Sequence, residues 1–342
     1  MPREETLYVA GHQWGAPTNF NPLSGNPAWP CSDTNETVYE TLFGYNQVTD
    51  KLDPILADKY QWVDPYTLKV TLHQGTRWQD GTSLTTEDVV YTFELSKKYS
   101  LAYSDFWTYA TGIKALDNRT VEINLNPAKP NRLIIMEQLG TVRILPKHIW
   151  INVEENYRSV IEFKNEKPVG SGPLKLLYFS PEKIILQRDD NYWGIRYFGK
   201  PAPKYVVHPI FKSNDAGNIA FEKAQIDLSQ QFCPTIWKIW EKGLPVSTWY
   251  KHPPYHIPGS IPTLYINIHK YPLSLPEVRR ALAYAINYEK IAEIAMTRYS
   301  VTVSPSMLIL PLENSYYDET IVAKYGWTYN PSKSIEILKG LG

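Results

Sequence analysis

Residues Tyr66 to Glu94, YTLKVTLHQGTRWQDGTSLTTEDVVYTFE, predict a strand, a tight turn and a capped helix in quick succession. Three apolar residues, Leu68, Val70 and Leu72, alternate with polar ones, and this two-residue period is typical of a half-buried strand. The dipeptide Asp80-Gly81 supplies the turn, because glycine accepts backbone angles that other residues avoid. The first part of the segment is therefore expected to be a strand that ends in a turn.

The helix is expected to begin just after this turn. Thr85 can act as its N-cap by accepting a hydrogen bond from the backbone N–H of Asp88. Acidic residues in the first turn suit the positive end of the helix dipole. The apolar face of the helix consists of Val89, Val90 and Phe93.

The same segment resembles one shared by extracytoplasmic solute-binding proteins of family 5, the peptide- and oligosaccharide-binding subunits of ABC importers. Six further segments resemble that family and follow its order along nearly the whole chain. Any one match is weak, whereas six in register make chance similarity improbable. The six segments are Val38–Tyr45, Pro54–Asp58, Pro168–Pro173, Arg188–Gly194, Ala224–Leu228 and Val278–Asn287.

The resemblance implies a mixed α/β fold of the type II periplasmic-binding-protein kind, in which two lobes hold a ligand between them. Residues 1–45 and 170–269 would form the main subdomain of lobe I, and residues 46–169 its accessory subdomain. Family members continue well past the region that resembles residues 329–338, so residues 270–342 are expected to be the start of a truncated lobe II. The chain thus resembles an N-terminal fragment, and a second polypeptide that completes the fold is one expected partner.

Composition excludes some classes of protein. Lysine plus arginine number 35, as do aspartate plus glutamate, so no overall positive charge favours nucleic acid as a partner. The sequence has no run of about eighteen apolar residues that would predict a membrane span. Its start lacks the basic and apolar regions of a secretory signal. The resemblance nevertheless implies an exported protein, periplasmic or at the cell surface, whose signal peptide is absent from this sequence.

Two cysteines, Cys31 and Cys233, are too few for a disulfide framework or a four-thiolate metal site. One bridge and two reduced, buried thiols are both open. His252 and His256 have four-residue spacing, but prolines around them exclude the helix that would direct both rings at one metal. No metal and no cofactor is therefore predicted.

The sequence offers no specific trace of catalytic machinery. The run Gly170-Ser171-Gly172 lacks the spacing of a nucleophile elbow and indicates a glycine pair at a turn. Asp189 and Asp190 are adjacent, so in an extended segment they point to opposite faces and cannot act on one bond as acid and base. The chain is predicted not to be an enzyme, with a glycosidase that uses scattered carboxylates as the alternative.

Further elements follow from periodicity and capping residues. Trp237 and Trp240 lie three apart, which places both on one side of a short helix. Ser274 and Glu277 fit a capping box, and Asn287 fits as the cap of the next helix. Strands are predicted over Thr6–Ala10, Thr120–Leu125, Leu174–Phe179, Lys183–Arg188, Tyr205–Phe211 and Leu264–Ile268.

A neutral, hydroxyl-rich solute needs flat apolar surfaces and fixed hydrogen-bonding groups. Tryptophan with asparagine or glutamine supplies these, and such residues occur where the family places its ligand loops. Core packing is the alternative role for Trp14 and Trp237, and a strand-end cap is the alternative for Asn267. The predicted ligand-binding residues are His12, Gln13, Trp14, Asn19, Gln230, Gln231, Trp237 and Asn267.

Two segments, Phe232–Trp240 and Gly243–Tyr250, resemble the branch of the family that carries β-linked oligosaccharides of the cellobiose and mannobiose kind. The predicted function is the capture of such a solute by closure about a hinge at Lys270–Leu275, followed by delivery to the membrane subunits of an ABC permease. An oligopeptide-binding protein of the same family is the main alternative. A docking module that binds only protein is a third possibility.

Overall fold

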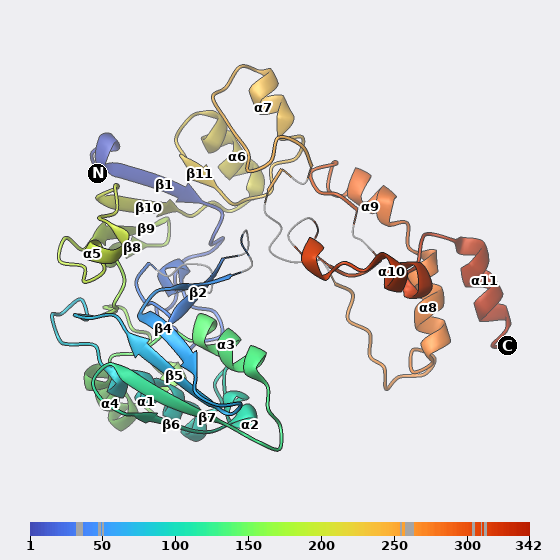
Figure 1. Ribbon diagram of the computed structural model, residues 1–342. Coiled ribbons are helices and arrows are strands. Elements are labelled where there is room, and N and C mark those ends of the chain that lie inside the picture. Colours follow the sequence, from blue (N-terminus) through green and yellow to red (C-terminus); the bar gives the residue numbers. More distant parts are fainter. Residues whose placement is uncertain are drawn as a thin grey trace. The chain divides into compact units, whose positions relative to one another are not determined.

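The computed structural model describes residues 1–31, 37–46, 49, 51–253, 255–256, 263–302, 305–308, 310 and 313–342. The chain divides into two compact units, Met1–Gln231 and Phe232–Gly342 (Figure 1). Over the described ranges, none of the helices has both the length and the hydropathy that a membrane span requires. The assignment of residues to lobes and subdomains given above remains a prediction.

The main sheet of the first unit contains β1 (Thr6–Ala10), β8 (Leu174–Ser180), β9 (Lys183–Arg188), β10 (Tyr205–Pro209) and β11 (Leu228–Ser229). Their spatial order is β11-β1-β10-β9-β8. β1 pairs in parallel with β10 and β11, whereas β9 runs antiparallel to its neighbours β10 and β8. Parallel pairing brings the carboxyl ends of β1, β10 and β11 to the same edge of the sheet.

Four of these strands confirm the sequence prediction, with small shifts at their ends. β8 extends to Ser180, and β10 ends at Pro209 because proline has no N–H to continue the ladder. Two helices connect strands of this sheet: α5 (Ile195–Phe198) lies between β9 and β10 in sequence, and α6 (Asn214–Glu222) lies between β10 and β11. Ser213 caps α6 by accepting from the N–H of Ala216 at 3.3 Å.

A second, antiparallel sheet contains β4 (Ala57–Trp62), β5 (Thr67–Leu72), β6 (Ala110–Ala115) and β7 (Thr120–Leu125). Every second residue of β5 and β7 is buried, as the alternation predicts. Two helices, α1 (Thr86–Lys98) and α2 (Phe106–Tyr109), pack against this sheet (Figure 1). The remaining elements of the region are α3 (Arg132–Thr141), α4 (Lys147–Asn156) and the strand pair β2 (Phe43–Asn46) and β3 (Lys51–Pro54).

Thr85 is the N-cap of α1, as predicted, but the donor to its side chain is the N–H of Glu87 and not that of Asp88. Its Oγ1 accepts from the N–H of Glu87 at 3.3 Å, and the Asp88 carboxylate accepts from the N–H of Thr85 at 2.9 Å, so a capping box is complete. The other carboxylate oxygen of Asp88 accepts from the N–H of Lys147 at 2.9 Å, at the start of α4. One buried carboxylate thus fixes the starts of two helices.

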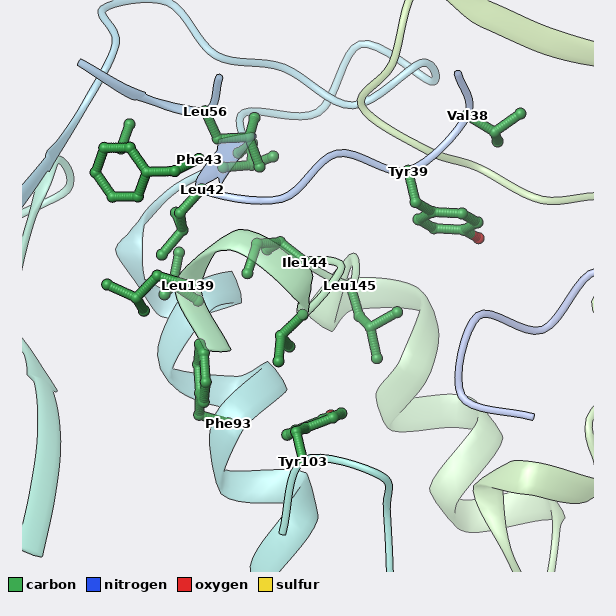
Figure 2. Packing of buried hydrophobic residues seen from close by; sticks show 14 of the residues in the cluster. Val38, Tyr39, Leu42, Phe43, Leu56, Phe93, Tyr103, Leu139, Ile144 and Leu145 are labelled. Atoms are coloured by element: carbon green, nitrogen blue, oxygen red, sulfur yellow. The ribbon is translucent and has the colours of Figure 1, made fainter. Parts of the chain in front are cut away.

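The core of the first unit joins the chain before β2 to the helices of the second sheet. Figure 2 shows Leu42, Leu139 of α3 and Phe93 of α1 pointing toward one another, and all three are fully buried. Burial of a leucine or phenylalanine side chain contributes about 1.5–3 kcal/mol. This cluster therefore stabilises the contact between the chain before β2 and the helical layer.

The segment Pro168–Pro173 passes very close to the chain at Val38. A Cβ added at Gly170 would lie 1.7 Å from the carbonyl oxygen of Val38, and one added at Gly172 would lie 2.5 Å from that of Thr37. Only glycine permits this approach of two backbones. The close approach of the two backbones therefore explains the presence of glycine at both positions without any catalytic role.

The second unit contains α7 (Trp237–Glu241), α8 (Pro276–Ala285), α9 (Tyr288–Ile294), α10 (Glu319–Tyr325) and α11 (Pro331–Lys339). α11 packs against α8. The predicted cap of α9 is confirmed, because Asn287 Oδ1 accepts from the N–H of Lys290 at 2.9 Å. Short 3-10 turns in the two units cover Arg3–Glu5, Trp29–Cys31, Val160–Glu162 and Asn314–Tyr316.

Two predictions in the second unit are wrong. Residues Leu264–Ile268 form no strand: none of the ladders among the described residues includes them, and Leu264 and Tyr265 are 71% and 91% exposed. An alternating sequence makes a strand only where a partner strand pairs with it. The capping box at Ser274 is also absent, since α8 has Leu275 as its N-cap without a side-chain hydrogen bond.

Candidate functional site

The carboxyl edge of the main sheet brings together most of the residues that the sequence analysis predicts. One loop leaves β1 at Gly11 and carries His12, Gln13 and Trp14, while Gln230 and Gln231 follow β11. In open α/β sheets, ligands bind outside the carboxyl ends of the strands. This edge is therefore the candidate binding site of the first unit.

Gly11 and Gly217 hold Gln231 in place. Gly11 has φ +93°, and an added Cβ would lie 2.5 Å from the backbone nitrogen of Gln231. On the α6 side, a Cβ added at Gly217 would lie 2.1 Å from Gln231 Oε1. The Gln231 side chain is 4% exposed and donates from Nε2 to Asn218 Oδ1 at 3.0 Å. It is thus buried between two glycines, whereas its neighbour Gln230 is exposed.

Three aromatic rings pack together beside this position. The rings of Trp29 and His208 are stacked with centroids 5.3 Å apart, and the ring of His12 lies 5.3 Å from Trp29 and 5.7 Å from His208. His208 belongs to β10, and its Nδ1 lies 2.7 Å from the carbonyl oxygen of Val9 in β1. We refer to His12, Trp29 and His208 as the ring cluster.

The two histidines of the ring cluster favour their neutral forms. Burial lowers the pKa of His12 to about 4, and the nearby His208 lowers it as well. Burial also lowers the pKa of His208, against the bond to Val9, which raises it. Removing an imidazolium from water is unfavourable, so both rings are uncharged near neutral pH.

The loop after β1 is organised by its own polar side chains. Gln13 donates from Nε2 to the carbonyl of Gly15 at 2.8 Å and accepts from the N–H of Trp29 at 3.2 Å. Asn19 Oδ1 accepts from Ser24 Oγ at 2.8 Å. Gln13 and Asn19 thus stabilise the loop. Trp14, in the same loop, is 42% exposed and is not part of the core.

Trp237 and Asn267 belong to the second unit. Trp237 and Trp240 both place their rings 5.9 Å from the ring of Tyr255. Asn267 is exposed, and its Oδ1 accepts from the N–H of His269 at 3.0 Å, so it caps a turn. The role of these two residues toward a ligand remains a prediction.

Sequence reasoning missed Trp29 and His208. Their contact follows from the pairing of β1 with β10, which are about 200 residues apart in sequence. The available signal was a histidine in the otherwise apolar strand Tyr205–Pro209, because a polar residue buried in a strand needs a partner.

A separate surface pocket of about 490 Å³ lies in the first unit, and none of the predicted ligand residues lines it. Its walls include Asp80, Glu166, Lys167 and Lys175 together with apolar residues of β8. Asp80 is engaged with His148 Nε2 at 2.8 Å. This charged, open pocket lacks the neutral character of the candidate site.

Other predicted features have simple structural roles. Asp189 pairs with Lys175 at 3.2 Å, and Asp190 pairs with Arg188 at 2.8 Å, so both carboxylates are held in ion pairs. Across the described residues, no three His, Cys, Asp or Glu side chains converge on one point as metal ligands. Cys233 is buried, while the side chain of Cys31 lies outside the described residues, and their pairing stays open.

Comparison with solved structures finds close similarity of fold. A periplasmic oligopeptide-binding protein of an ABC transporter from Thermotoga maritima matches all of this chain with a TM-score of 0.90 and 37% identity. A mannohexaose-bound structure with the same protein name and source matches with a TM-score of 0.89 and 38% identity. The chain covers 63% of each of those chains. The predicted mixed α/β fold of the periplasmic-binding-protein kind is confirmed.

Sequence comparison points the same way. The peptide transport periplasmic protein SapA of Salmonella typhimurium is 27% identical over 359 residues, which span 96% of this chain and 60% of that protein. The probable peptide-binding protein YejA of Agrobacterium fabrum is 25% identical over 238 residues, or 64% of this chain and 37% of that protein. The family described as bacterial extracellular solute-binding proteins, family 5 Middle, matches residues 51–342. The chain belongs to the bacterial extracellular solute-binding proteins of family 5.

Proposed function

We propose that this protein captures an uncharged, β-linked oligosaccharide of the cellobiose or mannobiose kind at the carboxyl edge of the main sheet. The single observation that carries the proposal is the packing of the ring cluster, in which three aromatic rings meet beside the ends of β1 and β10. Burial lowers the pKa of His12 and of His208 and so favours their uncharged forms. The amides Gln13, Gln230 and Gln231 lie at the same edge. Neutral donors and acceptors suit hydroxyl groups.

The carboxylate that directly precedes β11 is already paired. Asp227 lies just before β11, and it accepts from Arg3 Nη1 at 3.0 Å and from the N–H of Tyr8 at 2.8 Å. A charged ligand terminus placed directly against the neutral, buried rings would gain no counter-charge from the ring cluster itself, which is unfavourable. The mannohexaose bound to the Thermotoga maritima relative supports an oligosaccharide.

An oligopeptide is the second candidate ligand. The names of SapA, YejA and the Thermotoga maritima relative all refer to peptides. A peptide in extended form can also use the amides of this edge through its main chain. The two candidates therefore differ mainly in whether the site must accept charged termini.

The proposed mechanism is binding without turnover. The solute binds one lobe, the lobes close about residues Lys270–Leu275, and the closed form docks on the membrane subunits of an ABC permease. We place this event outside the cytoplasm, in the periplasm or at the cell surface, in line with the family.

Isothermal titration calorimetry of the full-length protein with cellobiose, mannobiose and a tripeptide tests the ligand class. Saturable binding of a disaccharide, with the tripeptide inert, is the expected result. Binding of the tripeptide alone would overturn the oligosaccharide proposal in favour of the second candidate. Incubation with a labelled disaccharide at high protein concentration tests turnover, and release of labelled monosaccharide would contradict a pure binding role.

A further inference from the structure

Two buried nitrogens of the ring cluster lack hydrogen-bond partners. Among the described residues, nothing pairs with His208 Nε2 or with Trp29 Nε1. His208 is 0% exposed and Trp29 is 3% exposed. Buried polar groups in folded proteins are nearly always hydrogen-bonded, so two such atoms on stacked rings require an explanation.

The hydrogen-bonding capacity of each nitrogen follows from its surroundings. The Val9 carbonyl can only accept, so His208 Nδ1 must carry the proton that it donates at 2.7 Å. In the neutral ring, Nε2 is then an acceptor. The indole Nε1 of Trp29 is always a donor. The stacked pair therefore presents one acceptor and one donor.

A hydroxyl group complements this pair better than other common ligand groups. A hydroxyl group that reached both nitrogens would accept from Trp29 Nε1–H and donate its own proton to His208 Nε2. A carboxylate has no proton to donate, an ammonium has no lone pair to accept with, and a peptide group carries its donor and acceptor on separate atoms. Among these ligand groups, the chemistry of the pair therefore favours an alcohol.

We propose that Trp29 and His208 form a subsite that takes a single hydroxyl group of the sugar, an inference that rests on the proposed function. The ring of His12 is partly buried and packs against both members of the pair, so the subsite adjoins the loop after β1, which also carries Gln13 and Trp14. Trp29 and His208 thereby become specificity-determining residues.

The test measures the affinity of mannobiose and of its monodeoxy analogues for three forms of the full-length protein: wild type, Trp29→Phe and Trp150→Phe. Trp29→Phe keeps an aromatic ring but removes the N–H, and it should weaken mannobiose binding roughly threefold to tenfold, the range of one net hydrogen bond. In wild type, the analogue that lacks the bonded hydroxyl should bind more weakly than mannobiose by a similar factor. In Trp29→Phe, this analogue and mannobiose should bind about equally. Trp150 is a buried residue of α4, so Trp150→Phe should leave the affinity unchanged.

A second measurement covers the case in which Trp29→Phe does not fold. The indole N–H resonance of Trp29 in wild-type protein should shift downfield with mannobiose and not with the matching deoxy analogue. Equal mannobiose affinity in Trp29→Phe and wild type, or an unmoved resonance, overturns the subsite while the proposed function stands. Wild-type protein that binds the tripeptide and no disaccharide overturns both.

Discussion

Gln79 and Gly170 are joined by a reciprocal pair of hydrogen bonds: the N–H of Gln79 donates to the carbonyl of Gly170 at 2.8 Å, and the N–H of Gly170 donates to Gln79 Oε1 at 3.1 Å. Gln79 Nε2 also donates to the carbonyls of Gly172 and Leu174, at 2.9 and 2.8 Å. One side chain thus ties the turn after β5 to the segment that leads into β8.

Replacement of Gln79 by alanine should therefore destabilise the first unit. Three side-chain hydrogen bonds are lost in a partly buried setting, and a loss of about 2 kcal/mol in the free energy of unfolding is expected. Urea unfolding followed by circular dichroism measures this change. Gln74→Ala is the matched control, because Gln74 is exposed and lies in the same connection between β5 and α1. A Gln79→Ala variant as stable as the control would contradict the linking role.

Gly217→Ala tests the role of Gln231 without substituting Gln231 itself. The new Cβ would lie 2.1 Å from Gln231 Oε1, so the flexible amide must move away and give up its bond to Asn218. Alanine favours the interior of α6 over glycine by about 1 kcal/mol, which offsets part of the lost stability.

The expected result for Gly217→Ala is a weaker affinity for the disaccharide, by roughly tenfold, with a nearly unchanged unfolding midpoint. Calorimetry and thermal unfolding measure the two quantities. Gly112→Ala is the control, because nothing lies within 4 Å of its added Cβ. Unaltered affinity in Gly217→Ala would show that Gln231 serves only the packing of the sheet edge.

Local sequence signals predicted the parts of the fold that depend on neighbouring residues. The alternation in β5 and the Thr85 cap of α1 are set within a few residues and are confirmed. The segment Leu264–Ile268 has the same alternation but forms no strand, because pairing requires a partner that the segment itself does not specify.

The candidate site was predicted only in part, for a similar reason. Gln231 is found at the sheet edge because it follows β11 directly, whereas Trp29 and His208 meet only after β1 and β10 have paired. The predicted loop residues Gln13 and Asn19 turn out to bond to their own loop. Amide side chains have both uses, and sequence does not separate them.

Acid should destabilise the protein through the ring cluster. The folded state lowers the pKa of His12 from 6.5 to about 4 and also lowers that of His208, so the unfolded chain binds protons more readily. The stability contribution of these neutral rings is complete above about pH 6.5 and is lost as the pH falls toward 4. The thermal midpoint should therefore decrease over this range.

A His12→Gln variant separates this effect from the titration of carboxylates, which both proteins share. Its thermal midpoint should decrease less than that of wild type between pH 7 and pH 4.5, as measured by differential scanning calorimetry. His269→Gln alters an exposed histidine of the second unit and should follow the wild-type curve. Parallel curves for His12→Gln and wild type would show that the ring cluster does not resist protonation.

Trp14→Ala separates the two roles that remain for this residue. Trp14 is 42% exposed and is not part of the core, so its removal should change the free energy of unfolding by less than about 0.5 kcal/mol. If the indole stacks on a sugar ring, its loss should weaken disaccharide binding at least tenfold, because an aromatic face in contact with C–H groups is a large part of such a site. Trp249→Ala is the matched control, since Trp249 is 65% exposed in the second unit and was not predicted to touch the ligand. A Trp14→Ala variant with a lower unfolding midpoint and full affinity would show that Trp14 serves packing and not binding. The ring cluster would then be the only aromatic group proposed to contact the ligand at this edge.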